Sequence, residues 1–283
     1  MIDASLPARH TGGVHSDERL ESGYGPATPA GDNVCNDFVR GEAAGYRRLA
    51  QARGDRVAAD ADLALTMTDG SSPTPFGNAA FTERPLEPDE WEAAAARLHA
   101  FYGAAAGGPF LVFSAWPTPD LRGRGFGLVG HPPLMWRPHV PITADAPQGV
   151  QIERVDASTI ATFEQVLVEG YPVPELQQST AGRMFPPATL DAGWSLWLGS
   201  LDGTPVATAA AFDDGRLGHV EFIASLPSAR GRGIGAAMTA VATAAYDRPA
   251  TLIASDPGRP IYERLGYVAL LRYTLWAGFR SST

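Results

Sequence analysis

A glycine-rich loop with two arginines is the feature of this 283-residue sequence most able to bind an anion. It reads Arg230-Gly231-Arg232-Gly233-Ile234-Gly235, and it lies between an apolar stretch that ends at Pro227 and a helical pattern. The first residues of a helix present unpaired N–H groups and the positive end of the helix dipole. Glycines let a phosphate approach the backbone and allow unusual φ angles. We therefore predict a phosphate-binding loop, to which Arg230 and Arg232 add positive charge.

Two other kinds of glycine-rich loop fit this segment less well. A dinucleotide-binding loop has the spacing G-x-G-x-x-G and an acidic residue after the next strand. Here Gly233 is followed by Ile-Gly-Ala-Ala, and the next strand ends in Ser255-Asp256. A Walker loop needs Gly-Lys followed by Ser or Thr, which the segment lacks. The remaining alternative is a plain strand–turn–helix whose glycines serve only tight packing.

The elements that must position this loop follow a regular pattern between residues 150 and 278. Short apolar runs predict strands, and apolar residues at helical spacing predict helices. Strands are predicted at 150–155, 194–200, 205–212, 217–225 and 251–255, and helices at 157–170 and 261–266. Residues 229–247 are predicted to be a glycine-rich loop that runs into a helix, and residues 267–278 to form one or two closing strands. Hairpins alternate with helical crossovers, so we expect an α/β (α+β) fold with a mixed sheet.

The loop and a second motif together resemble the GNAT superfamily of N-acetyltransferases. The pyrophosphate loop of that family reads R/Q-x-x-G-x-G/A, and residues 230–235 fit every fixed position. The second motif is a short helix ending Y-E-x-x-G-F/Y. It is matched by Tyr262-Glu263-Arg264-Leu265-Gly266-Tyr267, with Tyr in place of the more usual Phe. The resemblance covers about residues 150–278, and it implies a GNAT fold with splayed central strands and acetyl-CoA as co-substrate.

The six-residue loop pattern also occurs earlier, as Arg122-Gly123-Arg124-Gly125-Phe126-Gly127. This copy is followed by Pro132-Pro133, which cannot lie inside a helix. Without a helix N-terminus behind it, the loop loses its main means of binding an anion. We therefore predict no cofactor site at the earlier copy.

An internal repeat explains the earlier copy better. With an ungapped offset of 141 residues, Gly125-Phe126 falls on Gly266-Tyr267, and the apolar blocks on either side also align. Under this offset Tyr262 corresponds to Leu121, and the loop corresponds to residues 89–94 (DEWEAA). The first copy therefore has carboxylates where a phosphate should bind, and it has no phenol.

The predicted domain organisation follows from these assignments. Residues 1–32 hold few apolar side chains to offset the entropy of ordering, so they are predicted to be a flexible tail. Residues 33–142 are interpreted as a degenerate GNAT-like domain without cofactor, the alternative being an unrelated α+β cap domain. Residues 143–283 are the predicted GNAT acetyltransferase domain, and the proline-containing stretch 137–149 is the best candidate for a linker.

The resemblance implies which backbone groups hold acetyl-CoA. Those of Phe222, Ile223, Ala224 and Leu226 would pair with the pantetheine arm, and one N–H group would polarise the thioester carbonyl. Such preorganised donors are typically worth about 3 kcal/mol. The pyrophosphate would be held by the loop and the start of the helix: Arg230, Gly231, Arg232, Gly233, Ile234, Gly235 and Ala236.

Three side chains are candidates for proton transfer. A phenol with a pKa of about 10 can donate a proton to a thiolate, so Tyr262 is the predicted general acid; the alternative is a core tyrosine. By resemblance, Glu221 would relay a proton from the acceptor through water; the alternative is an outward-facing or salt-bridged glutamate. His219 shares the strand face of Glu221 by the two-residue period and is the weaker candidate base.

Acceptor recognition is less legible in the sequence. Residues 169–176 lie where GNAT proteins often carry an acceptor-binding loop, in which Glu169 and Glu175 would attract an ammonium group or serve as ordinary surface charges. Trp194 and Trp197 occupy alternate positions of a strand and are predicted to be half-buried sheet residues. The six histidines show no H-x-x-H or H-E-x-x-H spacing, so no metal is predicted.

The amino-acid composition argues against nucleic acids and membranes as binding partners of this protein. With 22 basic and 31 acidic residues the net charge is −9, which lacks the basic field that nucleic-acid binding needs and has the wrong sign for an anionic membrane. No apolar run approaches the roughly 20 residues of a membrane helix, and the N-terminus lacks a signal pattern. Cys35 is the single cysteine, so no intramolecular disulfide can form. We expect a cytoplasmic monomer or homodimer.

The expected function is acetyl-CoA-dependent N-acetyl transfer to a primary amine of a small molecule or amino-acid-like acceptor. The alternative is a non-catalytic acyl-CoA-binding or sensing protein that keeps the loop without turnover. A protein that uses the fold only for interaction fits less well, because decay of the site would allow larger side chains at Gly233 and Gly235.

Overall fold

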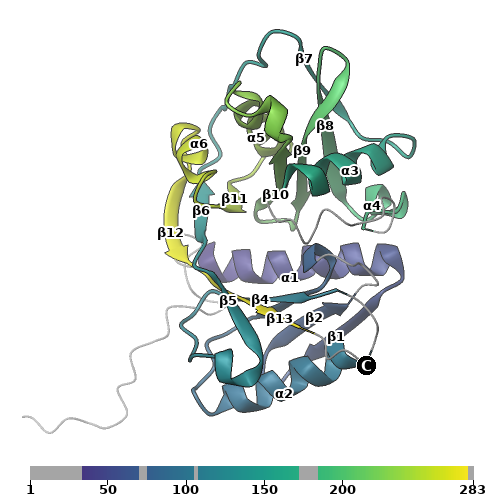
Figure 1. Ribbon diagram of the computed structural model, residues 1–283. Coiled ribbons are helices and arrows are strands. Elements are labelled where there is room, and N and C mark those ends of the chain that lie inside the picture. The colour runs from purple at the N-terminus through teal and green to yellow at the C-terminus, as the bar shows by residue number, and fades with distance from the viewer. Residues whose placement is uncertain (1–33, 70–74, 105–107, 172–183, 280–283) are drawn as a thin grey trace, which may run out of the picture. The chain divides into compact units, whose positions relative to one another are not determined.

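Two mixed sheets and the helices packed on them form the chain, shown as a computed structural model in Figure 1. The structure describes residues 34–69, 75–104, 108–171 and 184–279, so the predicted tail 1–32 lies outside the described residues. Residues 35–283 belong to one compact unit. Among the described helices, none has both the length and the apolar character needed to cross a bilayer.

The first half of the chain begins with the long helix α1 (Val34–Arg53) and the hairpin β1 (Arg56–Asp60) and β2 (Leu65–Asp69). It continues with β3 (Ala79–Thr82), α2 (Glu90–Gly103), β4 (Phe110–Ser114), β5 (Phe126–Gly130) and β6 (Pro133–Arg137). The first sheet has the strand order β1-β2-β3-β4-β13-β5. Strands β3 and β4 are parallel and are joined through α2, as expected for a crossover connection.

The second half begins with β7 (Val150–Arg154), α3 (Ile160–Gly170), α4 (Ala188–Asp191), β8 (Trp194–Leu201), β9 (Thr204–Asp213) and β10 (Gly218–Ser225). It ends with α5 (Ile234–Thr243), β11 (Ala250–Ile253), α6 (Arg259–Arg264), β12 (Val268–Arg272) and β13 (Thr274–Gly278). The second sheet has the order β12-β6-β11-β10-β9-β8-β7, with antiparallel and parallel pairs. The predicted mixed α/β fold is thereby confirmed.

Each sheet is completed by a strand from the other half of the chain. β13, the last strand of the second half, lies between β4 and β5 of the first sheet and pairs Thr274 with Ser114 and Gly278 with Phe110. β6, the last strand of the first half, lies between β11 and β12 of the second sheet. Figure 1 shows β6 in teal beside the yellow β12. The two halves are therefore joined by a reciprocal strand exchange, which we did not predict from the sequence.

The internal repeat expected at an offset of 141 residues is visible in the topology. The offset carries the bounds of β6 onto those of β13, and the order β1-β2-β3-β4-β13-β5 matches β8-β9-β10-β11-β6-β12. Val129 and Leu270, which the offset pairs, are each the extra residue of a bulge in an edge strand. A GNAT-like first half is therefore supported. The limits 33–142 and 143–283 stay predictions, and neither sheet lies wholly within one of them.

Helix α1 lies between the two sheets and contacts both (Figure 1). The ring of Tyr46 lies 5.1 Å from that of Phe81 in β3 and 6.3 Å from that of Phe222 in β10. Its apolar side chains are buried, including Phe38 and Leu49. This helix is therefore part of the core of both halves.

Glycine 45 allows α1 to approach the second sheet closely. A Cβ atom built on Gly45 would overlap the ring of Phe212, which is fully buried in β9. Alanine normally favours a helix over glycine by about 1 kcal/mol, but overpacking of a filled core typically costs 1–3 kcal/mol. Gly45→Ala is therefore expected to lower the free energy of unfolding, as measured by urea denaturation. Gly103→Ala, at a site where a Cβ meets no atom within 4 Å, is the control. Equal effects of the two variants would contradict this packing.

Candidate active site

The predicted phosphate-binding loop lies at the start of α5 and faces solvent. Gly231 and Gly233 have φ angles of 75° and 81°, in the left-handed region that favours glycine. Residues 230–233 are exposed. None of the N–H groups of residues 231–235 donates a hydrogen bond to any part of the chain that the structure describes. These amides are therefore available to an external acceptor.

Gly235 has no role in the fold that requires glycine. The nearest atoms to a Cβ built on it are Ile261 Cδ1 and Ser225 Oγ, both 3.9 Å away, and its φ angle lies outside the left-handed region. The fold would therefore accept a side chain here. The absence of a side chain keeps the helix N-terminus open, which fits the close approach of a phosphate group.

The two loop arginines differ in their contacts. Arg230 donates from Nη2 to the carbonyl oxygen of Gly170 at 2.8 Å and from Nε to that of Ser225 at 3.2 Å, so it ties the end of α3 to the end of β10. Arg232 is exposed and contacts no partner among the described residues. Arg232 is therefore the freer cation beside the loop amides, and Arg230 acts mainly as a structural tie.

Strand β10 parts from β11 and bulges just before the loop. The two strands pair only at Gly218–Ala250 and His219–Thr251, so beyond His219 no described strand covers this edge of β10. The bulge lies between Glu221 and Ala224, where Phe222 has a φ of 53°. Bulges re-aim backbone groups, and a non-glycine residue in the left-handed region costs about 1–3 kcal/mol. Strain of this kind is characteristic of functional sites.

The predicted pantetheine-binding stretch lies along this open edge. It comprises Phe222, Ile223, Ala224 and Leu226. Two of its backbone groups are already engaged, because the carbonyl of Phe222 accepts from Thr208 Oγ1 at 2.9 Å and the amide of Leu226 donates to the carbonyl of Val206 at 2.8 Å. Ala224 lies opposite Thr208 in the β9 ladder, whereas Ile223 lies in the bulge and pairs with no residue of β9. The backbone groups of Ile223 are therefore the better candidates for pairing with an extended ligand.

The first half has neither the open strand edge nor the unbonded helix N-terminus that the second half shows at β10 and α5. Strands β3 and β4 pair at three successive positions without a bulge in β3. At the start of α2, the carboxylate of Glu90 accepts from the amide of Glu87 at 2.8 Å and from Arg84 at 2.7 Å, and the Arg84 hydrogen bond lowers the pKa of Glu90 to about 2. The earlier copy of the loop pattern forms a 3₁₀ turn at Arg122–Arg124 followed by β5, so no helix follows it, as predicted. Leu121, at the position equivalent to Tyr262, is buried.

Tyr262, the predicted general acid, lies in α6 beside the start of α5. Cδ1 of its neighbour Ile261 lies 3.9 Å from a Cβ built on Gly235, and Tyr262 itself is 8% exposed. Burial, with smaller contributions from Tyr171, Tyr267 and Glu221, raises the pKa of Tyr262 above its usual value. The hydroxyl has no hydrogen-bond partner among the described residues. Tyr262 is therefore a protonated phenol whose proton is not held by the fold.

Glu221 and His219 lie on the side of β10 that faces α1. His219 Nδ1 is 2.8 Å from Glu42 Oε1, and His219 Nε2 is 3.0 Å from Asp214 Oδ2. Burial alone would lower the pKa of His219, but the hydrogen bonds to Asp214 and Glu42 outweigh it and the pKa is raised. Burial, together with the charge and hydrogen bond of Glu42, raises the pKa of Glu221 well above its usual value. The structure thus brings both predicted proton-transfer residues of β10 into one network.

Our reading of the sequence missed Glu42, which is contributed by the first half. It lies four residues after Phe38 and four before Tyr46, on the otherwise apolar face of α1. A carboxylate at such a position costs free energy unless it is paired. Its place on the buried face was therefore the signal that could have marked it.

The predicted acceptor segment is only partly described. Glu169 is exposed and accepts from Gln165 Nε2 at 2.9 Å, whereas Glu175 lies outside the described residues. Tyr171, at the end of α3, lies closer to the network: its ring is 4.5 Å from that of Phe76, and burial and Glu221 raise its pKa to about 12. Trp194 and Trp197 lie in β8 as expected, but both are buried rather than half-buried, because α1 and α5 cover the sheet.

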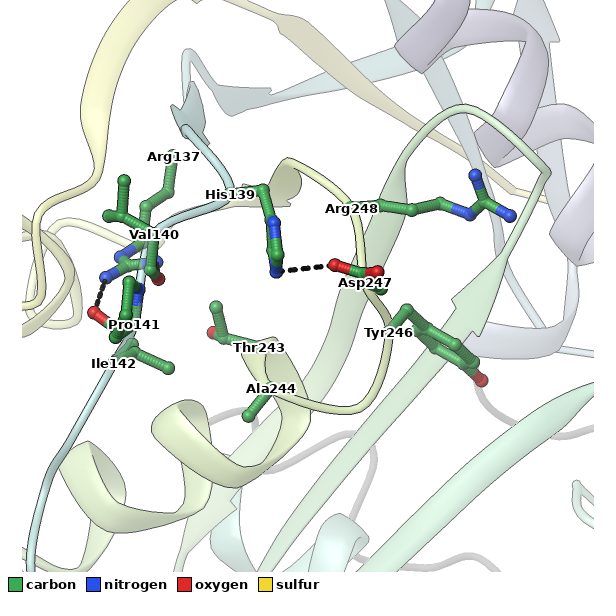
Figure 2. A pocket seen from close by; sticks show the side chains of 10 residues that line it. All are labelled: Arg137, His139, Val140, Pro141, Ile142, Thr243, Ala244, Tyr246, Asp247 and Arg248. Carbon is green, nitrogen blue, oxygen red and sulfur yellow. Dashed lines mark hydrogen bonds and ion pairs between the residues drawn. The ribbon is translucent and has the colours of Figure 1, made fainter.

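A cavity of about 210 Å³ lies elsewhere on the second half, and none of the proposed site residues lines it. It is formed by residues 137–142 after β6 and by residues 243–248 after α5 (Figure 2). His139 Nε2 points to Asp247 Oδ1 at 3.0 Å across it. The guanidinium of Arg137 donates to the carbonyls of Leu265, Val140 and Pro141. Since its charged groups already have partners within the chain, we assign this cavity no role in the reaction.

No group of three or more His, Cys, Asp or Glu side chains suited to a metal occurs in the described ranges.

Comparisons with known proteins agree with this geometry. Residues 161–267 match the family model of the acetyltransferase (GNAT) family. A GCN5-related N-acetyltransferase from Kribbella flavida is similar in structure, with a TM-score of 0.61 at 23% identity over 87% of this chain and 95% of that one. A functionally unknown conserved protein from Staphylococcus epidermidis has a TM-score of 0.58 at 14% identity over 80% of this chain and 94% of that one. The search of curated proteins finds no match.

These structural similarities cover both halves of the chain and, at such low identity, they concern the fold alone. The family match covers the part of the second half that contains β10, the loop, α5 and most of the second motif. That match points to acyl-CoA-dependent acyltransferase activity. Residues 161–267 are therefore similar to the acetyltransferase (GNAT) family.

Proposed function

We propose that this protein transfers an acetyl group from acetyl-CoA to a primary amine of a small molecule or amino-acid-like acceptor. The observation that carries the proposal is the set of unbonded amides at residues 231–235, of which residues 231–233 are exposed, next to the open edge of β10. Acetyl-CoA would supply the acetyl group as a thioester. We further propose that the protein acts in the cytoplasm as a monomer or homodimer, without nucleic-acid or membrane partners.

The binding residues have distinct tasks in this proposal. The amides of the loop hold a diphosphate, and Arg232 adds an unpaired positive charge beside them. The backbone of Ile223, in the bulge, orients the extended arm of the co-substrate along β10. A backbone N–H of the bulge polarises the thioester carbonyl, which such preorganised donors do at a gain of about 3 kcal/mol.

The proposed reaction needs a base that takes a proton from the amine and an acid that gives a proton to the departing sulfur. Glu221 takes a proton from the ammonium form of the acceptor, so the nitrogen gains the lone pair that forms the N–C bond. Tyr262 gives its proton to the sulfur as the C–S bond breaks. The nitrogen loses its second proton to solvent as the amide forms, and the phenolate of Tyr262 is reprotonated from solvent. The raised pKa of each group suits its task, because a base with higher proton affinity is stronger and a protonated phenol is required as the acid.

Cofactor binding is tested by the thermal shift that acetyl-CoA produces. At a hundredfold excess over Kd, linkage stabilises the folded protein by about 2.7 kcal/mol. Gly235→Glu is expected to abolish this shift, because a carboxylate would occupy the helix N-terminus meant for the diphosphate. The matched control is Gly123→Glu in the earlier copy of the pattern, where a Cβ meets no atom within 4 Å. No shift at millimolar acetyl-CoA, or loss of the shift only in Gly123→Glu, would show the proposal to be wrong.

Turnover is tested by a screen of small amines with acetyl-CoA, following the release of free thiol. Release that depends on both compounds supports the proposed reaction and identifies the acceptor class. A full thermal shift without thiol release for any amine would instead support the acyl-CoA-binding alternative.

A further inference from the structure

Four titratable side chains form a continuous line from the surface of the second half to Glu221 in β10. In order they are Asp214, His219, Glu42 and Glu221. His219 is fully buried and Glu42 is 1% exposed. The rings of Phe212 and Phe38 stack on the imidazole, at centroid distances of 4.4 and 5.4 Å. Burying titratable groups such as His219 and Glu42 costs free energy that the packing of the described residues does not require.

The line depends on the close approach of α1 to β10. A Cβ built on Gly41, the residue before Glu42, would overlap the imidazole of His219 and the carboxylate of Asp214. The helix backbone therefore lies directly against His219, which allows Glu42 to reach both His219 and Glu221. His219 and Glu42 are 177 residues apart in the sequence, in different halves of the chain.

The hydrogen bonds limit how protons are distributed along this line. Both nitrogens of His219 face carboxylate oxygens, and only the imidazolium form can donate from both. Glu42 also shares a hydrogen bond with Glu221. Such a bond between two carboxyl groups needs a proton, and two buried carboxylates in contact do not both ionise readily. The Glu42–Glu221 pair therefore holds one proton in common.

Among the described residues, Glu42 is the carboxyl group whose charge and hydrogen bond raise the pKa of Glu221. The other titratable groups around Glu221 are phenols: Tyr46 from α1, Tyr171 from the end of α3, Tyr262 from α6 and Tyr273 from the segment before β13. Burial raises the pKa of each phenol, so all are neutral near pH 7. Within the described ranges no basic side chain hydrogen-bonds Glu221.

We propose that Glu42 is a positioning residue for Glu221, through which the first half of the chain fixes the carboxyl group that takes the acceptor's proton. This proposal rests on the proposed function. In the step, an N–H bond of the ammonium group breaks, the proton joins the ionised Glu42–Glu221 pair, and the electron pair stays on nitrogen. The positive charge of His219 compensates the charge that remains on Glu42. The first half, whose own α2 N-terminus is closed, thus contributes to the chemistry of the second.

The pH profile of kcat tests the proposal. The base must be ionised, so kcat is expected to rise with pH through the raised pKa of Glu221. Glu42→Gln removes the negative charge and offers an amide donor, so the rising limb is expected to move to lower pH by at least one unit, which corresponds to a tenfold change in proton affinity. The thermal shift by acetyl-CoA is expected to persist. Glu42→Asp keeps the charge and is expected to restore most of the wild-type profile.

A matched control lies one turn earlier on the same helix. Asp37 also joins α1 to the second half, through an exposed ion pair with Arg216 at 3.1 Å, but it does not contact His219 or Glu221. Asp37→Asn is expected to leave the pH profile unchanged. An unchanged pH profile of kcat in Glu42→Gln, in protein that still binds acetyl-CoA, would overturn the proposal. An equal shift of the rising limb in Glu42→Gln and Asp37→Asn would overturn it as well.

Infrared spectroscopy tests the shared proton without any turnover. Wild-type protein at neutral pH is expected to show the C=O stretch of a protonated carboxylic acid, which disappears in Glu221→Gln and in Glu42→Gln. Absence of this band from wild-type protein would overturn the proposal even if the enzyme is active and even if Glu42→Gln does not fold. If the band is present but no amine is ever acetylated, the proposed function fails while the shared proton stands.

Discussion

Two fragments of this protein, residues 1–142 and 143–283, are expected not to fold separately and to recover a folded protein when they are mixed. Each sheet would lose the strand that separates two others, β13 between β4 and β5 in the first sheet and β6 between β11 and β12 in the second. Each fragment would also keep a strand whose partners lie in the other fragment. Circular dichroism and cooperative urea unfolding of the fragments, alone and combined, measure this outcome.

The equivalent strands cannot simply exchange places within one fragment. In the first sheet a Cβ on Gly278 would overlap the ring of Phe110, and the repeat places Arg137 at the same position of β6. In the second sheet, the guanidinium of Arg137 holds three carbonyl groups that a glycine could not reach. If β6 took the place of β13 in the first sheet, the Arg137 side chain would therefore be packed against the buried ring of Phe110. Cooperative unfolding of either fragment by itself would show that this barrier is too small.

Tyr262→Phe is expected to lower kcat by about 100-fold or more while leaving the thermal shift by acetyl-CoA unchanged. The substitution keeps the ring and removes only the hydroxyl, which no described residue hydrogen-bonds. The fold therefore loses little, whereas the departing thiolate loses its proton donor. Steady-state kinetics with an amine identified by the screen measure the effect on kcat.

Tyr267→Phe is the matched control for this substitution. The hydroxyl of Tyr267 lies 2.6 Å from Thr243 Oγ1 in the core, and burial raises the pKa of this phenol as well. Loss of that hydrogen bond is expected to cost about 1 kcal/mol of stability and to leave kcat nearly unchanged. If Tyr262→Phe retains wild-type kcat, Tyr262 is a packing residue whose ring lies 6.2 Å from that of Tyr267.

The local features of this protein were determined by its sequence alone. The apolar periodicity placed the strands, and the predicted strands 150–155 and 194–200 match β7 and β8 to within a residue of their observed limits. The glycines and the apolar strand before them marked the loop at residues 230–235, while Pro132-Pro133 excluded a helix after the earlier copy. The offset of 141 residues was also legible. These features depend on φ angles, side-chain period and ring constraints within a few residues, so a single stretch of sequence is enough to fix them.

Only the tertiary structure decided which strand joins which sheet and which carboxylate meets His219. β6 and β13 have similar apolar patterns, and the choice between their sheets depends on what lies opposite Gly278 and Arg137. Glu42 resembles any other helical glutamate until α1 is packed on β10. Such contacts join residues more than a hundred positions apart, and their free energy comes from the shape and charge of the assembled core rather than from local conformation.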